Sequence, residues 1–165
     1  MPELVVEVIV PAPPERVWEV LADFAAYGEW HPYETITGNS ASLSQVRVTG
    51  RKLGSSQTLE QNWAFVVKSE PGRRLDLLSG NLLLWWSRRF FHLAPHPQGT
   101  LLRHGVKMSG LLAKRAFART HKIERLQPYY DALGEALIRR VYRPRTAQPS
   151  TGNRRQRRAA KAGPK

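Results

Sequence analysis

The order of hydrophobic and polar positions changes its period along the chain. Residues 4–10 are mostly β-branched and end at the cluster Pro11-Ala-Pro-Pro14, which predicts a strand. Apolar residues then recur at helical spacing from Val17 to Ala25, and the residue before Pro32 is disfavoured in the α conformation. We therefore expect one strand, a short helix to about residue 23, and a second short helix or turn over 24–30.

The middle of the chain is predicted to form consecutive antiparallel strands. Clusters of Gly, Pro, Asn and Ser separate runs of strand length between residues 35 and 110, with no convincing long helix among them. The six predicted strands are 35–38, 46–53, 58–68, 74–78, 83–93 and 100–108. Because the intervening turns are short, these strands should pair as a meander.

Alternation assigns faces to two of these strands, because successive side chains of a strand point to opposite faces of the sheet. The sets expected to point inward are Gln61, Trp63, Phe65 and Val67, and Leu102, His104, Val106 and Met108. In the strand 83–93 both parities contain aromatic residues, so alternation leaves the direction of Arg89 open.

Residues 111–142 carry an apolar stripe at helical spacing, which predicts a long terminal helix. Pro128 falls inside this stripe and is expected to kink or interrupt the helix. The apolar face needs a partner, and the concave side of a curved antiparallel sheet is the only surface long enough to cover it. The sequence therefore predicts an α+β fold with seven strands around the long helix and two short helices at one end.

Several short motifs follow one another in a fixed order over residues 4–142. Residues 8–32 contain an apolar strand followed by Pro-x-x-x-Val-Trp, Leu-x-Asp and Tyr-x-x-Trp-x-Pro. Later motifs are Glu70-Pro-Gly-Arg-Arg-Leu75, Phe91-His-Leu-Ala-Pro95, Gly99-Thr100, His104 and Gly110-Leu-Leu112. Together they resemble the START-like superfamily, also called SRPBCC, in its polyketide cyclase/dehydrase branch, which has the helix-grip fold.

This resemblance implies a cavity between the sheet and the long helix that binds a hydrophobic or aromatic small molecule, including lipids. Its members include cyclases, hydrolase-like enzymes, lipid carriers and hormone receptors, so a reaction must be argued from the site itself. Binding without chemistry is the first hypothesis. The alternative is a polyketide cyclase-like enzyme, in which His104 with Arg89 or Gln61 would move a proton and stabilise an enolate.

The residues expected to form the cavity share aromatic or apolar character and inward parity. The expected walls are Trp30, Trp63, Phe65, Phe91, Met108, Phe117 and Tyr130, and His104 is the main polar anchor. Ordinary core packing is an equally good interpretation of each aromatic residue, and a structural role is the commoner one for a single interior histidine. If Arg89 points inward, it needs an anionic or carbonyl partner, whereas an outward Arg89 needs none.

Charge is concentrated at the C-terminus. The 165 residues contain 26 Lys and Arg against 13 Asp and Glu, and eight of those bases lie in residues 143–165, where there is no acid. We expect residues 1–142 to form one domain and 143–165 to be a disordered basic tail. Such a tail could bind nucleic acid, a partner molecule or an anionic surface, but without interleaved aromatic residues a solubilising or nonspecific role is favoured.

The sequence also lacks several common signals. There is no cysteine, the five histidines lack metal-ligand spacing, and no glycine-rich phosphate loop is present, so no metal or cofactor is expected. The first residues carry acids where a signal peptide has bases, and their apolar run is too short to span a membrane. We therefore expect a cytoplasmic protein without a transmembrane segment, and leave its oligomeric state open.

Overall fold

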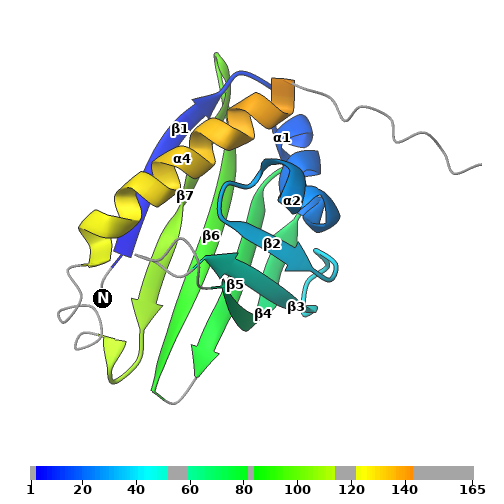
Figure 1. Ribbon diagram of the computed structural model, residues 1–165. Helices are drawn as coiled ribbons and strands as arrows, with labels where there is room; N and C mark the ends of the chain where they lie inside the picture. The colour runs from blue at the N-terminus through cyan, green and yellow to red at the C-terminus, as the bar shows by residue number, and fades with distance from the viewer. Residues whose placement is uncertain (1–2, 52–58, 82–83, 114–121, 143–165) are drawn as a thin grey trace, which may run out of the picture.

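The computed structural model describes residues 3–51, 59–81, 84–113 and 122–142, so the predicted tail and Phe117 lie outside the described residues. The elements follow the predicted order, and the fold is α+β (Figure 1). They are β1 (Glu3–Val10), α1 (Pro14–Ala22), the 3-10 turn η1 (Phe24–Ala26), α2 (Tyr27–Trp30), β2 (Glu34–Thr37), β3 (Gln45–Arg51), β4 (Leu59–Glu70), β5 (Arg74–Asn81), β6 (Trp85–His96), β7 (Gly99–Ser109) and α4 (Lys122–Tyr142).

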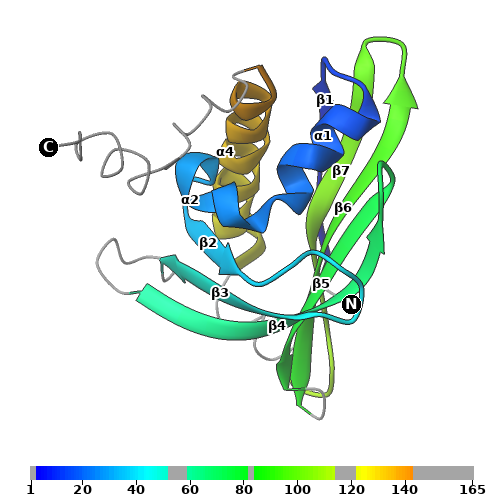
Figure 2. The ribbon, with the colours of Figure 1, turned by 90° about the vertical axis from the view of Figure 1, so that its right-hand side faces the viewer.

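The seven strands form one antiparallel sheet in the order β1-β7-β6-β5-β4-β3-β2. Strands β2 to β7 pair as the predicted meander, and β1 closes the sheet against β7, with Glu3 opposite Lys107 and Val10 opposite Thr100. The sheet curves around the helices, and α1, α2 and α4 all lie on its concave side (Figures 1 and 2). We call this concave side the inner face and the opposite side the outer face, which no described helix covers.

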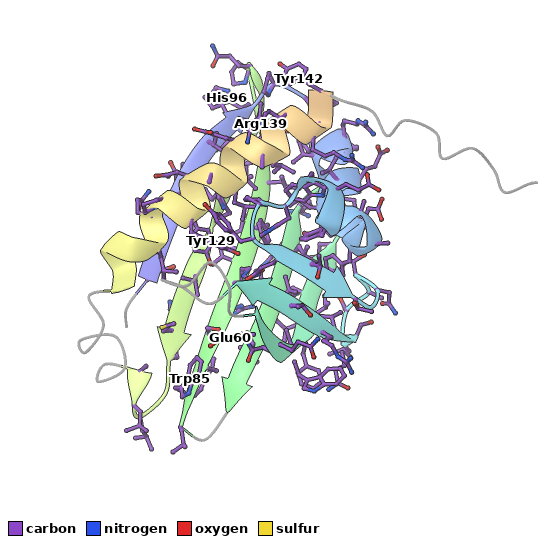
Figure 3. All side chains as sticks on the ribbon, viewed as in Figure 1. Glu60, Trp85, His96, Tyr129, Arg139 and Tyr142 are labelled. Atoms are coloured by element: carbon purple, nitrogen blue, oxygen red, sulfur yellow. The ribbon has the colours of Figure 1, made fainter. Side chains whose placement is uncertain are left out.

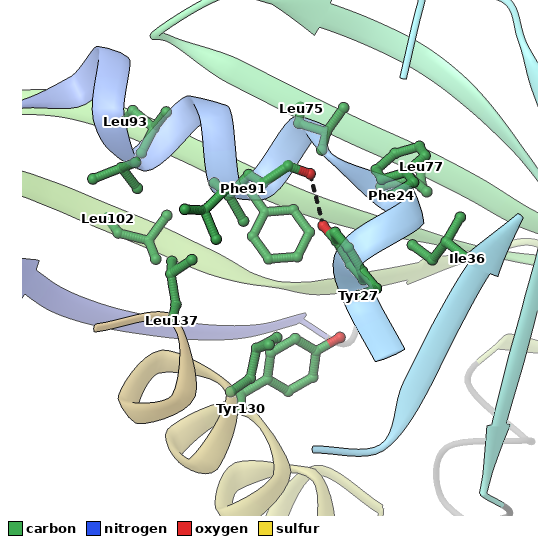
Figure 4. Packing of buried hydrophobic residues seen from close by; sticks show 14 of the residues in the cluster. Phe24, Tyr27, Ile36, Leu75, Leu77, Phe91, Leu93, Leu102, Tyr130 and Leu137 are labelled. Atoms are coloured by element: carbon green, nitrogen blue, oxygen red, sulfur yellow. Dashed lines mark hydrogen bonds between the residues drawn. The ribbon is translucent and has the colours of Figure 1, made fainter. Parts of the chain in front are cut away.

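The N-terminal helices close one end of this half-barrel. Helix α1 has a proline at its start and Glu15 in its first turn, where the helix dipole favours an acid, and it buries Val17 and Leu21. The Tyr27 hydroxyl donates a hydrogen bond of 2.8 Å to the backbone carbonyl of Leu21, which ties α2 to α1 (Figure 4). His31 is extended, and α2 therefore ends at the residue before it.

The core fills the space between the inner face and α4. The apolar stripe of α4 is buried as predicted, with Tyr130, Leu133 and Leu137 each at most 3% exposed. Figure 4 shows Tyr130 and Leu137 beside Phe91 and Leu102 of the sheet. Pro128 is exposed, and α4 continues through it, so the proline does not interrupt the helix.

Strand β4 presents the face opposite to the one predicted. Ala64 and Val66 are buried, whereas Trp63 and Phe65 are 54% and 48% exposed on the outer face, and Gln61 lies on that face with them. The prediction for the set Gln61, Trp63, Phe65 and Val67 is therefore wrong. Its cause is an irregularity between Val66 and Lys68, where one extra residue puts Lys68 on the same face as Phe65 and breaks simple alternation.

Strand β7 has the predicted faces. Leu102, His104 and Val106 are buried on the inner face, and Met108 is partly buried against the same core. On β6, Arg89 lies on the inner-face parity with Phe91 and Leu93, which settles the direction that alternation had left open. Among the described residues, no helix has the length and apolar character needed to cross a membrane.

Candidate functional site

A cavity of about 340 Å³ opens on the inner face of the sheet, lined by described residues of β2 to β6. Its polar lining consists of Glu34, Glu60, Asn62, Ser79, Ser87 and Arg89. Its other lining residues are Val48, Gly50, Trp63, Ala64, Leu77, Gly80 and Trp85, and Figure 3 labels Glu60 and Trp85 on this part of the sheet. No described residue of α4 lines this cavity, whereas the sequence placed the cavity against the helix.

An ion pair forms one wall of the cavity. Glu34 shares a face of β2 with buried Ile36, and Arg89 shares a face of β6 with buried Phe91, so strand alternation turns both charges inward. Arg89 donates hydrogen bonds from both terminal nitrogens to the carboxylate of Glu34, and its Nη2 lies 2.9 Å from Oε1. The side chains are only 23% and 13% exposed. A Cβ at Gly50 would lie 2.8 Å from Cγ of Glu34, so the glycine leaves room for this side chain.

The pair is charged but internally neutralised. Burial would raise the pKa of Glu34, but the charge and hydrogen bonds of Arg89 outweigh burial and hold that pKa below its usual value. Burial by itself would lower the pKa of Arg89. The charge of Glu34 outweighs burial and holds that pKa well above its usual value. Because Glu34 neutralises Arg89, the ion pair does not favour an anionic ligand.

Two tyrosines and one histidine flank the ion pair. Burial raises the pKa of Tyr129 well above its usual range and that of Tyr130 to about 12, so both phenols stay protonated and can donate. The buried Tyr129 hydroxyl lies close enough to Glu34 to help lower the pKa of that carboxyl, although it makes no hydrogen bond of good geometry with a described residue. Burial lowers the pKa of His31 to about 4, and its neutral Nδ1 accepts the backbone N–H groups of Tyr33 and Glu34. His31 thus fixes the segment that presents Glu34.

His104 lies in the packed core, away from the lining of this cavity. It is fully buried, and its ring lies parallel to Phe91 at 6.1 Å and tilted against Tyr130 at 5.7 Å. Burial lowers its pKa to about 4, so the imidazole is neutral at pH 7. Neither ring nitrogen has a hydrogen-bond partner in the described part of the chain. Gly134 of α4 faces the ring, since a Cβ there would lie 3.4 Å from Nε2.

The predicted site residues separate into three groups. Phe91, His104 and Tyr130 lie together, but in the core rather than on the cavity lining. Arg89 lines the cavity and Trp63 borders it from β4. The remaining predicted residues are not on the lining: Trp30 packs against Tyr27, Met108 packs on the core, Phe65 and Gln61 belong to the outer face, and Phe117 lies outside the described residues.

Sequence reasoning missed most of the polar lining. Glu34, Asn62, Ser79 and Ser87 were not among the candidates, although each continues the inward parity of its strand. Ser79 follows the buried residues Leu75 and Leu77 at intervals of two, so it lies on the same face of β5. A polar residue at the next inward position of a buried strand was therefore the signal that could have found it. For Asn62 that signal was hidden by the irregularity after Val66.

Residues 1–141 match the family described as polyketide cyclase / dehydrase and lipid transport. Protein CV1439 from Chromobacterium violaceum is similar in structure, with a TM-score of 0.67 and 15% identity, covering 86% of this chain and 99% of that one. Protein MLL2253 from Mesorhizobium loti has a TM-score of 0.61 and 22% identity over 84% and 98% of the two chains.

An AHSA1-like protein from Aeromonas hydrophila has a TM-score of 0.59 and 12% identity over 83% and 90% of the two chains. At these identities the three likenesses show the helix-grip fold alone. No curated protein matches the sequence significantly.

Proposed function

The chain belongs to the polyketide cyclase / dehydrase and lipid transport family, and from this premise we propose that it binds a neutral, mainly apolar small molecule in its inner-face cavity. The ligand carries a hydroxyl or carbonyl group on an aliphatic or aromatic body. The observation that carries this proposal is the cavity of about 340 Å³ with the Glu34–Arg89 pair in its wall.

The lining supports a ligand with these two parts. Val48, Leu77 and Trp85 offer apolar contact, whereas the serines, Asn62 and the ion pair offer hydrogen bonds in fixed positions. A carboxylate ligand is disfavoured, because Glu34 already neutralises Arg89, the only base among the described lining residues. A hydroxyl or carbonyl group can bond to the pair without bringing a charge into a partly buried site.

Binding is favoured over cyclase-like chemistry by the placement of the candidate catalytic groups. His104 and Gln61 do not line the cavity, and the only one of the three predicted catalytic candidates that does, Arg89, is held by Glu34. An enolate would have to compete with that carboxylate for the guanidinium. The proposed role is therefore to hold a molecule rather than to convert it.

Two neighbouring residues of β4 provide a matched test. Asn62 lines the cavity and Gln61 lies on the outer face, so Asn62→Trp should fill the cavity while Gln61→Trp should leave it open. The probe is 2-naphthol, a neutral bicyclic phenol, titrated by calorimetry into each purified protein. We expect saturable binding by the wild type and Gln61→Trp, and its loss in Asn62→Trp.

The charge argument has its own control. 2-Naphthoate has the same ring system with a carboxylate, and it should bind more weakly than 2-naphthol at pH 7. Equal loss of binding in both tryptophan variants, or no saturable binding by the wild type, would contradict the proposal. Native mass spectrometry of freshly purified protein then weighs any molecule that the cavity retains.

A further inference from the structure

The outer face of the sheet carries exposed aromatic residues next to arginines. Trp63 and Phe65 follow each other on the same face of β4, 54% and 48% exposed, and the strand rise places their Cα atoms about 6.6 Å apart. The Arg47 guanidinium of β3 lies 4.6 Å from the centre of the Trp63 ring. No described helix covers this face, so these flat side chains are open to a partner (Figures 1 and 2).

A basic hollow of about 230 Å³ lies on the same face, over β5, β6, β7 and β1. Four bases line it, namely Arg74, Arg88, Arg103 and Lys107, against the two acids Glu3 and Asp76. Asp76 is fully buried beneath the arginines and binds the guanidinium groups of Arg74 and Arg88 through Oδ2, each with an N–O distance of 2.7 Å. The carboxylate therefore holds two cations in place. Arg103 is paired in turn with Glu7 at 2.9 Å, so four bases meet three acids and the hollow keeps a net charge of about +1.

The register of the sheet joins the aromatic pair to the hollow. Phe65 lies opposite Leu78, Leu78 opposite Arg88, and Arg88 opposite Lys107. These residues form one continuous row across β4, β5, β6 and β7. A chain-like ligand lying along this row would meet aromatic rings at one end and cations at the other.

We propose that this outer face binds single-stranded nucleic acid, with bases stacking on Trp63 and Phe65 and phosphates held by the basic hollow. Every base has a π-face that an aromatic side chain can stack on, so this arrangement needs no particular base sequence. An apolar protein surface or the interior of a membrane would strip water from the Arg47 guanidinium without offering it an anion. The eight bases of residues 143–165 add attraction for a polyanion.

This site lies on the face of the sheet opposite to the inner-face cavity, with which it shares Trp63 alone, and it gives the basic tail a second role. The tail by itself lacks aromatic residues for stacking, and the outer face supplies them. Charge in the tail would then strengthen binding generally, while Trp63 and Phe65 would make it depend on unstacked bases.

The test uses the full chain and a fluorescein-labelled oligouridine of about 16 nucleotides, at about 50 mM salt, followed by fluorescence anisotropy. Trp63→Ala should weaken binding roughly 5-fold to 150-fold, the range expected for loss of one stacked base, and Trp63→Phe should retain most of the affinity. Tyr142→Ala is the matched control, because Tyr142 is 62% exposed at the end of α4, and it should bind as the wild type does.

A charge variant tests the hollow separately. Lys107→Gln removes an exposed cation whose nearest acid, Glu3, is 3.9 Å away, so the fold should tolerate it. We expect the slope of log affinity against log salt to fall by about 0.7, as for one lost phosphate contact on a single strand. Arg139→Gln on α4, also exposed, should leave the slope unchanged.

Three results would overturn the proposal. Unchanged oligouridine affinity in folded Trp63→Ala would mean that the tail alone binds. Trp63-dependent binding to vesicles of phosphatidylcholine and phosphatidylserine, with no binding to oligouridine, would make the face a membrane contact. A dimer that Trp63→Ala dissociates, again without oligouridine binding, would make it a self-association surface. Circular dichroism of each variant confirms that the fold is retained.

Discussion

Replacing His104 by leucine should stabilise the protein and reduce its sensitivity to acid. The imidazole is fully buried between Phe91 and Tyr130, and neither of its nitrogens has a partner in the described residues. Leaving a buried polar group without a hydrogen bond costs about 1–3 kcal/mol, whereas the lost ring contacts are worth about 0.5–1.5 kcal/mol. At pH 7 the free energy of unfolding of His104→Leu should therefore exceed that of the wild type by about 1 kcal/mol.

The difference should grow as the pH falls. Burial lowers the pKa of His104 to about 4, below the value of about 6.5 expected in the unfolded chain, so the unfolded state takes up the proton first. The stability that depends on the neutral ring is complete above pH 6.5 and is lost as the pH falls through 6.5 towards 4. At pH 4 the loss amounts to about 3 kcal/mol, from 1.36 kcal/mol for each pKa unit.

Urea unfolding, followed by circular dichroism at about pH 7 and pH 4, measures both effects. His31, whose pKa burial also lowers to about 4, contributes equally to both proteins and cancels in the difference. The control is His96→Leu, since His96 is partly exposed and should change stability by less than about 0.5 kcal/mol at either pH. The reasoning is refuted if His104→Leu loses as much stability as the wild type between pH 7 and pH 4.

Two other predictions concern the ion pair and the turns. Arg89→Leu leaves the buried Glu34 carboxylate without its cation and should lower the free energy of urea unfolding by about 3–5 kcal/mol. Adding Glu34→Leu should recover most of that loss. A double variant as unstable as Arg89→Leu would contradict this. Gly99→Ala should lower the free energy of unfolding by about 3 kcal/mol or more, because φ is +132° and the new Cβ would lie 2.3 Å from the Val10 carbonyl oxygen. Gly72→Ala, also at positive φ but with nothing within 4 Å, should cost about 1 kcal/mol, and equal losses would exclude the steric explanation.

The elements and their order were predictable because the local signals agree with one another. Turn residues separate each strand of the meander from the next. The apolar stripe that ends at Val141 repeats at helical spacing, whereas the side chains of a strand alternate every two residues. In β7 the inward set alternates strictly, so the burial of Leu102 and His104 followed directly. In β4 both faces are apolar, and Lys68, which lies on the outer face, does not indicate the direction of Ala64 and Val66, because the irregularity lies between them.

The candidate site was far less predictable. Glu34 and Arg89 are 55 residues apart, and they meet because the sheet curves enough to bring β2 and β6 together. Alternation says which way a side chain points but not which distant strand it faces. The same limit explains why His104, correctly predicted to point inward, belongs to the core rather than to the cavity lining.

The pairing of β1 with β7 sets the order in which the protein can fold. During synthesis from the N-terminus, Val6 has no strand to pair with until His104, its opposite residue, has been made. The hairpins of the meander need only neighbouring segments and can form earlier, so β1 completes the sheet late. Until then its apolar residues and unpaired backbone remain exposed, which makes the nascent chain most vulnerable to aggregation just before β7 is complete.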